Sequence, residues 1–485
     1  MTINNNFGRE PPSPKTGALD ADYGHHPIHD RAQRPLQVIV IGAGPSGIAM
    51  LIELLKIPFL TIRCFEKNPD VGGTWLETRY PGAACDVASH AYQYSFCSKT
   101  DCFAPAEEIG DYFTSVAKKY GLYNHITFHS RVTSAEWDEL KAQWKVMVES
   151  DTREAAPETF VADVLINAGG ILNDWAWPEI DGLQDFKGHR VHTATWDSTI
   201  DLKDKTVAVI GSGASSIQVV PSIQPVAKKV DVYVRSPTYI LPTVGFGFES
   251  STFNESYSES DMQNFSTKPA YYKQFRKRIE QQMNENFSNS SKTSTEQIEA
   301  RLWAENMMKK AILSPELQKK LIPSWELGCR RLTPGLPYLN AVQQPNVNVI
   351  RDGIKRILEG GIETVNDQVI EADVIICATG FITSFSSRFN IVGRYGRTLK
   401  EMWKDRGAEA YLGTAIADRD RLTGRVTAVW PGSSIHFMEM VETPRWEDFE
   451  IQYVHSNPFR FMGNGFSQRE TNGADLTYYL DQMRE

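Results

Sequence analysis

The sequence predicts an α/β fold that contains two parallel β-sheets, and two observations lead to this prediction. An apolar strand, a glycine-rich turn and a helix-forming stretch follow one another twice, in residues 36–55 (LQVIVIGAGPSGIAMLIELL) and 205–220 (KTVAVIGSGASSIQVV). Two further stretches share one pattern, ADVLINAGG at residues 162–170 and ADVIICATG at 372–380. We interpret both as strands at crossovers between two domains. Such repetition indicates two units of similar architecture in one chain.

The first repeat has the sequence of a Rossmann-like strand, turn and helix. Val38–Ile41 are all apolar, as in a parallel strand that is covered on both faces. Gly42 permits the tight turn, Gly44 lets a pyrophosphate approach the main chain, and Gly47 lets helix and strand pack closely. Glu66 ends the next strand, 24 positions after Gly42, where a carboxylate can bind ribose hydroxyls. The alternative is a glycine turn in a buried sheet that binds no nucleotide.

The second repeat is similar but carries the opposite charge. Gly211 and Gly213 match the first two glycines, and Ser216 stands where the third would be. Arg235 lies 24 positions after Gly211, where the first repeat has Glu66. A guanidinium pairs with a ribose 2′-phosphate, so this site is expected to prefer NADPH over NADH. The alternative is an exposed arginine that closes an edge strand.

Length and composition limit the class of protein. The 485 residues exceed one ordinary domain, and 41% hydrophobic with 23% charged residues is typical of a globular chain, so two or three packed units are expected. The net charge of −9 argues against nucleic acid as a partner. No C-x-x-C pair occurs among the six cysteines, which makes zinc binding and disulfide exchange weak interpretations: Cys64, Cys85, Cys97, Cys102, Cys329 and Cys377.

The amino-terminal stretch predicts where the protein resides. MTINNNFGREPPSPKTGALD is polar and has no apolar core, so it is expected to be a disordered tail and not a secretory signal. No apolar run is long enough to span a bilayer. We therefore expect a cytoplasmic protein with no membrane span.

Two dinucleotide sites in one chain predict one tightly held FAD and one exchanging NADPH, with hydride passing between them. Because no C-x-x-C pair can receive the electrons, oxygen is the expected acceptor. The sequence gives no information about oligomeric state.

The stretch FKGHRVHTATWD identifies a family. Phe186, Gly188, His192, Trp196 and Asp197 match the pattern F-x-G-x-x-x-H-x-x-x-W-(P/D) at every position, just ahead of the second repeat. The chain thereby resembles the single-component, flavin-dependent Baeyer-Villiger monooxygenases. Its local sequence is most similar to that of filamentous-fungal members with roles in secondary metabolism. Related N- or S-oxygenating flavin monooxygenases typically have another aromatic residue at the position of Trp196. Without the rest of the motif, His192 and Trp196 could equally be side chains packed in an ordinary linker.

Two further stretches match the family, GGTWLETRYPGAACDVASHAYQYSF from Gly72 and GCRRLTPGLPYLNA from Gly328. The resemblance implies cofactor-binding and active-site residues within them: Gly73, Thr74, Trp75, Asp86, Tyr92 and Arg331. It also implies insertion of one oxygen atom from O2 next to a ketone carbonyl, through a C4a-peroxyflavin, to give an ester or lactone. Arg331 would stabilise the peroxide anion and Asp86 would orient Arg331, whereas His192 would act at a hinge. A structural salt bridge is the alternative for Asp86 and Arg331.

The resemblance also implies a division into domains and a departure from the family. The expected parts are a disordered tail (1–35), the first part of the FAD-binding domain (36–183), the first part of the NADP-binding domain (184–244), a helical insertion (245–324), the second part of the NADP-binding domain (325–375), and the FAD-domain return with a shortened C-terminal tail (376–485). After Tyr411–Ala415 a segment that covers the flavin in the family is expected to be missing. An uncoupled NADPH oxidase and a catalytically impaired flavoprotein therefore remain alternatives.

Overall fold

The computed structural model describes residues 35–87, 90, 92–94, 104–151, 156–241, 258–285, 294–330, 332–384, 386–404, 409–411, 414–415 and 424–425. Residues Leu36–Glu442 form one compact unit, which contains all of these except Pro35. The expected disordered tail, apart from Pro35, and most of the expected shortened C-terminal tail lie outside the described residues.

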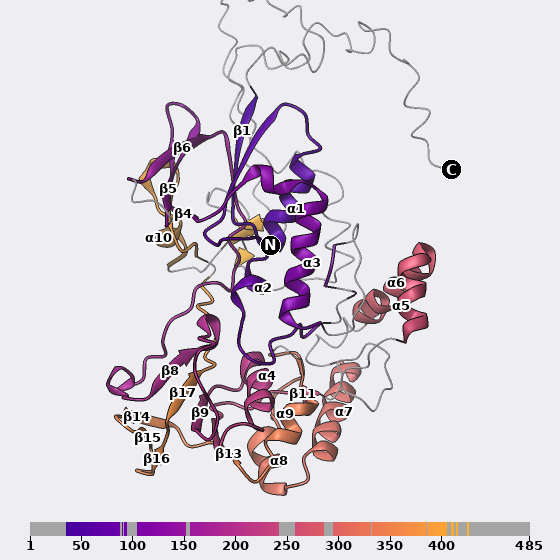
Figure 1. Ribbon diagram of the computed structural model, residues 1–485, viewed down its shortest axis with the longest axis vertical. Helices are drawn as coiled ribbons and strands as arrows, with labels where there is room; N and C mark the ends of the chain where they lie inside the picture. The colour runs from indigo at the N-terminus through magenta and orange to yellow at the C-terminus, as the bar shows by residue number, and fades with distance from the viewer. Residues whose placement is uncertain are drawn as a thin grey trace, which may run out of the picture. The chain divides into compact units, whose positions relative to one another are not determined.

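The first parallel sheet has the strand order β3-β2-β1-β7, and Figure 1 labels its strand β1. Its strands are β1 (Leu36–Ile41), β2 (Leu60–Phe65), β3 (Ile126–Thr127) and β7 (Val164–Asn167). One face is covered by α1 (Pro45–Leu54), α3 (Ala106–Lys119) and the short α2 (Thr74–Glu77), with η1 (Leu122–His125) leading into β3. The apolar strand residues predicted from the sequence are buried on both faces because helices lie on one side and a second sheet lies on the other.

That second layer is an antiparallel meander whose side chains pack on Ile39, Ile41 and Phe65 of the first sheet. It consists of β4 (Ser130–Asp138), β5 (Gln143–Ser150) and β6 (Glu158–Ala162), and β18 (Asn390–Val392) joins it parallel to β4. Strand β18, from a much later part of the sequence, thus completes the sheet in which β4 begins at Ser130.

The second parallel sheet has the order β13-β10-β9-β17-β8. Its strands are β8 (His189–His192), β9 (Thr206–Ile210), β10 (Lys229–Tyr233), β13 (Val347–Ile350) and β17 (Val374–Cys377). Helix α4 (Ala214–Ile223) packs on one face, and an antiparallel sheet of β14 (Ile354–Leu358), β15 (Gly361–Thr364) and β16 (Val369–Glu371) covers the other. The expected domain boundary between residues 375 and 376 falls inside β17, so this sheet continues to Cys377. The prediction of an α/β fold with two parallel sheets is confirmed.

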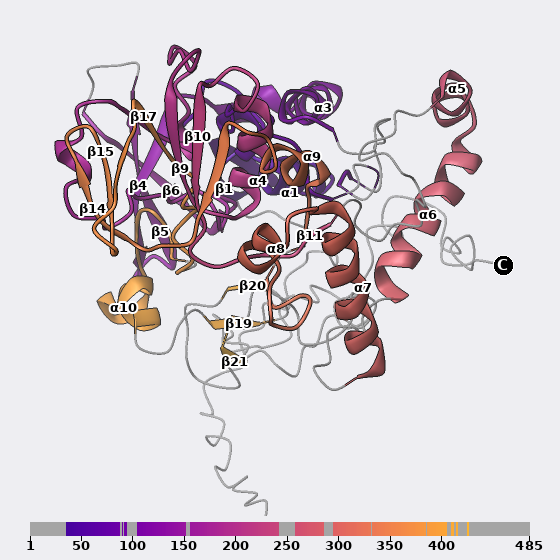
Figure 2. The ribbon, with the colours of Figure 1, turned by 90° about the horizontal axis from the view of Figure 1, so that it is seen from below.

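The segment in which a helical insertion was predicted contains α5 (Glu259–Thr267), α6 (Pro269–Glu285), α7 (Thr295–Ala311) and α8 (Pro315–Leu321). Helix α7 packs with α9 (Leu336–Ala341) and β11 (Ile240–Leu241) in Figure 2. Strand β11 pairs with β12 (Thr333–Pro334).

The remaining elements are short: η2 (Leu183–Asp185), η3 (Thr193–Thr195), η5 (Arg394–Gly396), α10 (Leu399–Lys404), β19 (Glu409–Tyr411), β20 (Thr414–Ala415) and β21 (Gly424–Arg425). Among the helices of the described ranges, none combines the length and apolar character that a membrane crossing requires.

Candidate functional site

The first glycine turn lies between β1 and α1 and has no room for side chains at two positions. Gly42 has φ 95°, and a Cβ there would lie 2.9 Å from the carbonyl oxygen of Ala168. A Cβ on Gly47 would lie 1.9 Å from the carbonyl oxygen of Gly42. Helix α1 begins at Pro45, so its free main-chain N–H groups face the turn. The strand, turn and helix predicted from the sequence are therefore present, with the spacing that an anion-binding turn requires.

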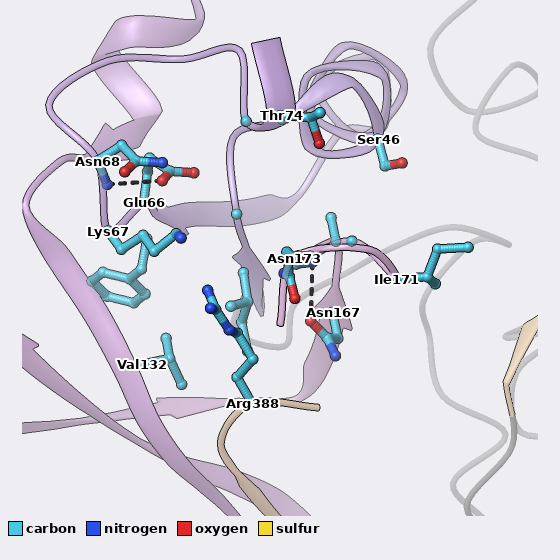
Figure 3. A pocket seen from close by; sticks show the side chains of 18 of the residues that line it. Ser46, Glu66, Lys67, Asn68, Thr74, Val132, Asn167, Ile171, Asn173 and Arg388 are labelled. Atoms are coloured by element: carbon cyan, nitrogen blue, oxygen red, sulfur yellow. Dashed lines mark hydrogen bonds between the residues drawn. The ribbon is translucent and has the colours of Figure 1, made fainter. Parts of the chain in front are cut away.

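A second glycine, Gly73, approaches this turn from the N-terminus of α2. Gly73 has φ 55°, and a Cβ on it would lie 2.9 Å from Cα of Gly44. Thr74 begins α2, and its side chain and that of Ser46 lie at the same cavity (Figure 3). The two glycines let two main-chain segments meet where a cofactor phosphate group would lie.

The cavity at these turns has a volume of about 320 Å³, within the size of small-molecule sites. Gly42, Gly44, Glu66, Gly73, Thr74 and Tyr92, all predicted as cofactor-binding residues, line it. Side chains that the sequence did not single out line it as well: Ser46, Lys67, Asn68, Asn167, Asn173 and Arg388. In Figure 3, Lys67 and Arg388 extend toward one another across the cavity. Arg388 lies just before β18, so residues from early and late parts of the sequence together form the wall of the cavity.

Glu66 lies at the end of β2 with only 3% of its surface exposed. Its Oε2 accepts the Ala43 N–H at 2.6 Å and its Oε1 accepts the Asn68 N–H at 2.8 Å. Burial raises the pKa of Glu66, and these two main-chain hydrogen bonds oppose the increase. The carboxylate is thereby fixed at the cavity wall beside the glycine turn, where it can accept hydrogen bonds from hydroxyl groups.

Trp75 and Tyr92 form a contact behind this wall. Trp75 is buried, its Nε1–H donates to the Tyr92 hydroxyl at 3.1 Å, and the rings meet edge to face at 5.5 Å. Trp75 therefore supports Tyr92, which lines the cavity, and does not itself line it in the described structure.

The second glycine turn lies between β9 and α4. Gly211 has φ 130°, and a Cβ there would lie 2.3 Å from the carbonyl oxygen of Ala378, so the turn requires glycine. At Gly213 a Cβ would meet nothing within 4 Å, which leaves open space at the N-terminus of α4. Ser216, at the third position of the motif, is fully buried in α4. This turn can therefore admit a phosphate group at Gly213.

The structure corrects the position of Arg235. Strand pairing aligns Ile41 with Phe65 in the first sheet and Ile210 with Tyr233 in the second. The counterpart of Glu66 is therefore the buried Val234, and the prediction that Arg235 occupies that place is wrong by one residue. The reason is that the connection from β9 to β10, counted between paired residues, is one residue shorter than the connection from β1 to β2. Arg235 is exposed.

The residue that follows Arg235 remains tied to the turn. The Ser212 hydroxyl donates to the carbonyl oxygen of Ser236 at 2.7 Å. Arg235 therefore lies next to the second glycine turn, although it follows the position that corresponds to Glu66 by one residue.

The stretch FKGHRVHTATWD contains strand β8 of the second parallel sheet and the residues on either side of it. Phe186 is buried in the core of the second sheet, and a Cβ on Gly188 would lie 2.3 Å from the carbonyl oxygen of Asp373. Trp196 is half-buried against the same sheet's core. Asp197 is exposed and accepts from the Thr199 N–H and hydroxyl at 2.9 and 2.6 Å, which lowers the pKa of Asp197. Asp197 therefore caps a local turn.

His192 is fully buried at the end of β8. Its Nδ1 accepts the Ala194 N–H at 3.1 Å, which leaves Nε2 to donate to the Thr379 hydroxyl at 3.1 Å. Its ring stacks on Trp175 at 4.8 Å. Burial lowers the pKa of His192 and so favours the neutral form of the ring. The side chain links the two segments that cross between the sheets.

The predicted catalytic pair is only partly described. Asp86 is half-buried in the loop after Gly82, and its carboxylate lies close enough to Tyr80 to raise the pKa of that residue. Arg331 lies outside the described residues. Its neighbour Arg330 is exposed and lies over the Trp325 ring at 5.0 Å.

The sequence and the fold of this chain are similar to those of known proteins. The flavin-binding monooxygenase-like (FMO-like) family matches residues 36–324. The FAD-binding monooxygenase tazF of Aspergillus terreus is 34% identical over 542 aligned positions, which include 92% of this chain and 95% of that protein. A Baeyer-Villiger monooxygenase of Pseudomonas aeruginosa is 33% identical over 415 positions, 84% of this chain and 76% of that protein. The structure of oxidized steroid monooxygenase bound to NADP superposes with a TM-score of 0.66 at 30% identity and covers 78% of each chain. The chain belongs to the flavin-binding monooxygenase-like family of enzymes.

Proposed function

We propose that this chain is an FAD- and NADPH-dependent Baeyer-Villiger monooxygenase that inserts one oxygen atom from O2 next to a ketone carbonyl and forms an ester or lactone. The observation that carries the proposal is the complete stretch Phe186–Asp197, which lies in the sequence between two glycine turns of the kind that bind dinucleotides and contains strand β8 of the second sheet. Relatives that are named Baeyer-Villiger monooxygenases support the same reaction.

The first site fits the adenosine diphosphate portion of FAD. Gly44 and Gly73 leave main chain alone at the place where phosphates would approach, and the start of α1 supplies N–H donors. The buried Glu66 carboxylate is held where ribose hydroxyls can donate to it. When bound, FAD would accept hydride from NADPH and supply the chemistry of oxygen activation.

The second site fits NADPH. The open space at Gly213 would take the pyrophosphate at the N-terminus of α4, and the exposed Arg235 would pair with the 2′-phosphate. His192, which is buried and has a lowered pKa, would act at the hinge between the two crossing segments and not as an acid.

Asp86 and Arg331 remain the proposed catalytic pair. A permanent cation is suited to stabilise the anionic oxygen that develops when a nucleophile adds to a ketone carbonyl. The Asp86 carboxylate would orient that cation and balance its charge. Loss of one such donor typically lowers the rate by about 10²- to 10³-fold.

The test is the fate of labelled oxygen. Purified protein with bound FAD, NADPH and a panel of cyclic and aryl ketones under ¹⁸O2 is expected to yield an ester or lactone that carries one ¹⁸O atom, measured by mass spectrometry. Hydrogen peroxide is quantified in the same samples. Oxygen transfer to nitrogen or sulfur substrates with none to any ketone would contradict the proposed reaction.

An uncoupled NADPH oxidase is the second candidate, and one observation favours it. The alignment with tazF spans 542 positions, more than the 485 residues of this chain, so that relative has residues without a counterpart here. If they belong to the segment that excludes water from the flavin, reduced cofactor would release hydrogen peroxide. NADPH oxidation with stoichiometric hydrogen peroxide and no oxygenated product identifies this candidate.

A further inference from the structure

One side chain of α4 holds the loop that carries Asp86. Gln218 lies in the second turn of α4, and its Nε2 donates to the carbonyl oxygen of Ala84 at 2.9 Å. Its Oε1 accepts from the Tyr80 hydroxyl at 2.6 Å and from the Ala84 N–H at 3.5 Å. We call Tyr80, Ala84 and Gln218 the α4 latch. Both ends of the amide are thus used by a loop that lies more than 130 residues away in the sequence.

The loop main chain touches α4 directly between these two contacts. Gly82 has φ 81°, and a Cβ on it would lie 2.5 Å from the carbonyl oxygen of Gln218 and 2.2 Å from Oγ of Ser222. Glycine is therefore required for the close approach. The loop cannot shift along the helix without breaking the hydrogen bonds of the latch.

The latch joins two places that the proposed reaction uses. Asp86 follows Ala84 by two residues, and Gly213 immediately precedes α4. Burial raises the pKa of Tyr80, a hydrogen bond from Ser215 lowers it, and the Asp86 carboxylate raises it again, so Asp86 lies near the same hydroxyl. The expected pyrophosphate site and the expected catalytic carboxylate are therefore linked through one helix and the hydrogen bonds of the latch.

We infer that Gln218 is a positioning residue, which couples nucleotide binding at the N-terminus of α4 to the placement of Asp86. This inference rests on the proposed function for the identity of the nucleotide and the role of Asp86. A helix moves as a rigid element, so a nucleotide that fixes α4 also fixes the loop that the latch holds. Coupling of this kind is reciprocal, so the intact latch also strengthens nucleotide binding.

Hydrogen–deuterium exchange of the FAD-loaded enzyme, with and without NADP⁺, tests the inference. In the wild type, NADP⁺ is expected to slow exchange both at residues 211–216 and in the peptide of residues 78–87. In Gln218→Leu the slowing is expected to persist at 211–216 and to disappear at 78–87. NADP⁺ affinity is expected to fall about three- to tenfold, the range that one or two hydrogen bonds support. Oxygenated product per NADPH consumed is expected to fall with it.

Two further variants separate positioning from general stability. Gln224→Leu makes the same exchange at the C-cap of the same helix, but Gln224 donates to Asn346 at 2.8 Å and not to the loop, so protection at 78–87 is expected to persist. Tyr80→Phe keeps the ring and removes one hydrogen bond, and its effect is expected to be smaller than that of Gln218→Leu.

The outcomes distinguish the inference from the function on which it rests. NADP⁺ protection of residues 78–87 that survives in Gln218→Leu, or that is lost equally in Gln224→Leu, would overturn the inference. Wild-type enzyme that forms product while NADP⁺ leaves this peptide unchanged would overturn the inference alone. Failure of the wild type to bind NADP⁺ would overturn both.

Discussion

Replacing His192 with Phe tests the polar part of the link between the two crossing segments. Phe keeps an aromatic ring against Trp175 but removes both hydrogen bonds of the imidazole. The half-buried Ala194 N–H then loses its acceptor, which costs about 1–3 kcal/mol, whereas the exposed Thr379 hydroxyl can turn to water and costs about 0.5–1 kcal/mol. We expect a total loss of about 1.5–4 kcal/mol in the free energy of unfolding.

Urea unfolding followed by circular dichroism measures the total, and hydrogen exchange of the Ala194 amide measures the local part. Thr379→Val is the control and is expected to cost about 0.5–1 kcal/mol. Because the first change has already broken the bond to Thr379, the double variant is expected to be no less stable than His192→Phe alone. Costs that add in full, or an Ala194 amide that exchanges at the wild-type rate in His192→Phe, would refute the assigned hydrogen bonds.

Four other outcomes follow from the structure. Burial lowers the pKa of His192, so as pH falls below the ordinary value of 6.5 the unfolded chain binds a proton before the folded chain does. The free energy of unfolding of the wild type is therefore expected to decrease below this pH. His192→Phe is expected to remove that part of the decrease, measured by urea titrations at several pH values. Gly188→Ala places a Cβ against the carbonyl oxygen of Asp373 and is expected to lower stability by about 2–4 kcal/mol by denaturant unfolding. Arg388→Ala is expected to weaken FAD binding by about tenfold or more in fluorescence titration of the apoprotein, and Arg388→Lys by less; unchanged affinity would remove Arg388 from the site. Arg235→Ala is expected to raise the Kd of NADPH far more than that of NADH, and equal increases would contradict its pairing with the 2′-phosphate.

The glycine turns could be predicted because their requirements are local. Gly42 and Gly211 need positive φ values, and Gly47 must approach the residue that begins its own motif. Such constraints act over a few residues and leave a readable pattern. The place of Arg235 could not be predicted in the same way, because counting positions from Gly211 assumes connections of equal length. A connection shorter by one residue shifts the register by one.

Two functional candidates left no signal in the sequence because they depend on contacts between distant segments. Arg388 reaches the cofactor cavity from the return segment and lies 3.4 Å from Asp174, which is 214 residues earlier. Gln218 meets Tyr80 across 138 residues. Nothing in the residues around either one distinguishes it from an ordinary polar side chain on a helix or loop. Only the folded chain brings these side chains to a site.

The spacing of the stretch Phe186–Asp197 follows from the geometry of two neighbouring strands. Gly188 immediately precedes β8, where it must approach the main chain of Asp373 just before β17, and His192 ends β8, where it reaches Thr379 just after β17. The interval from Gly188 to His192 is therefore the length of one strand, with a contact to the partner strand at each end. Strand β8 begins the second sheet after the first crossing segment, and β17 is the last strand of that sheet before the chain returns. A glycine and a histidine at this spacing hold β8 against the segments on either side of β17, and the proposed transfer of hydride between two bound nucleotides would need such an alignment for the reacting groups to meet.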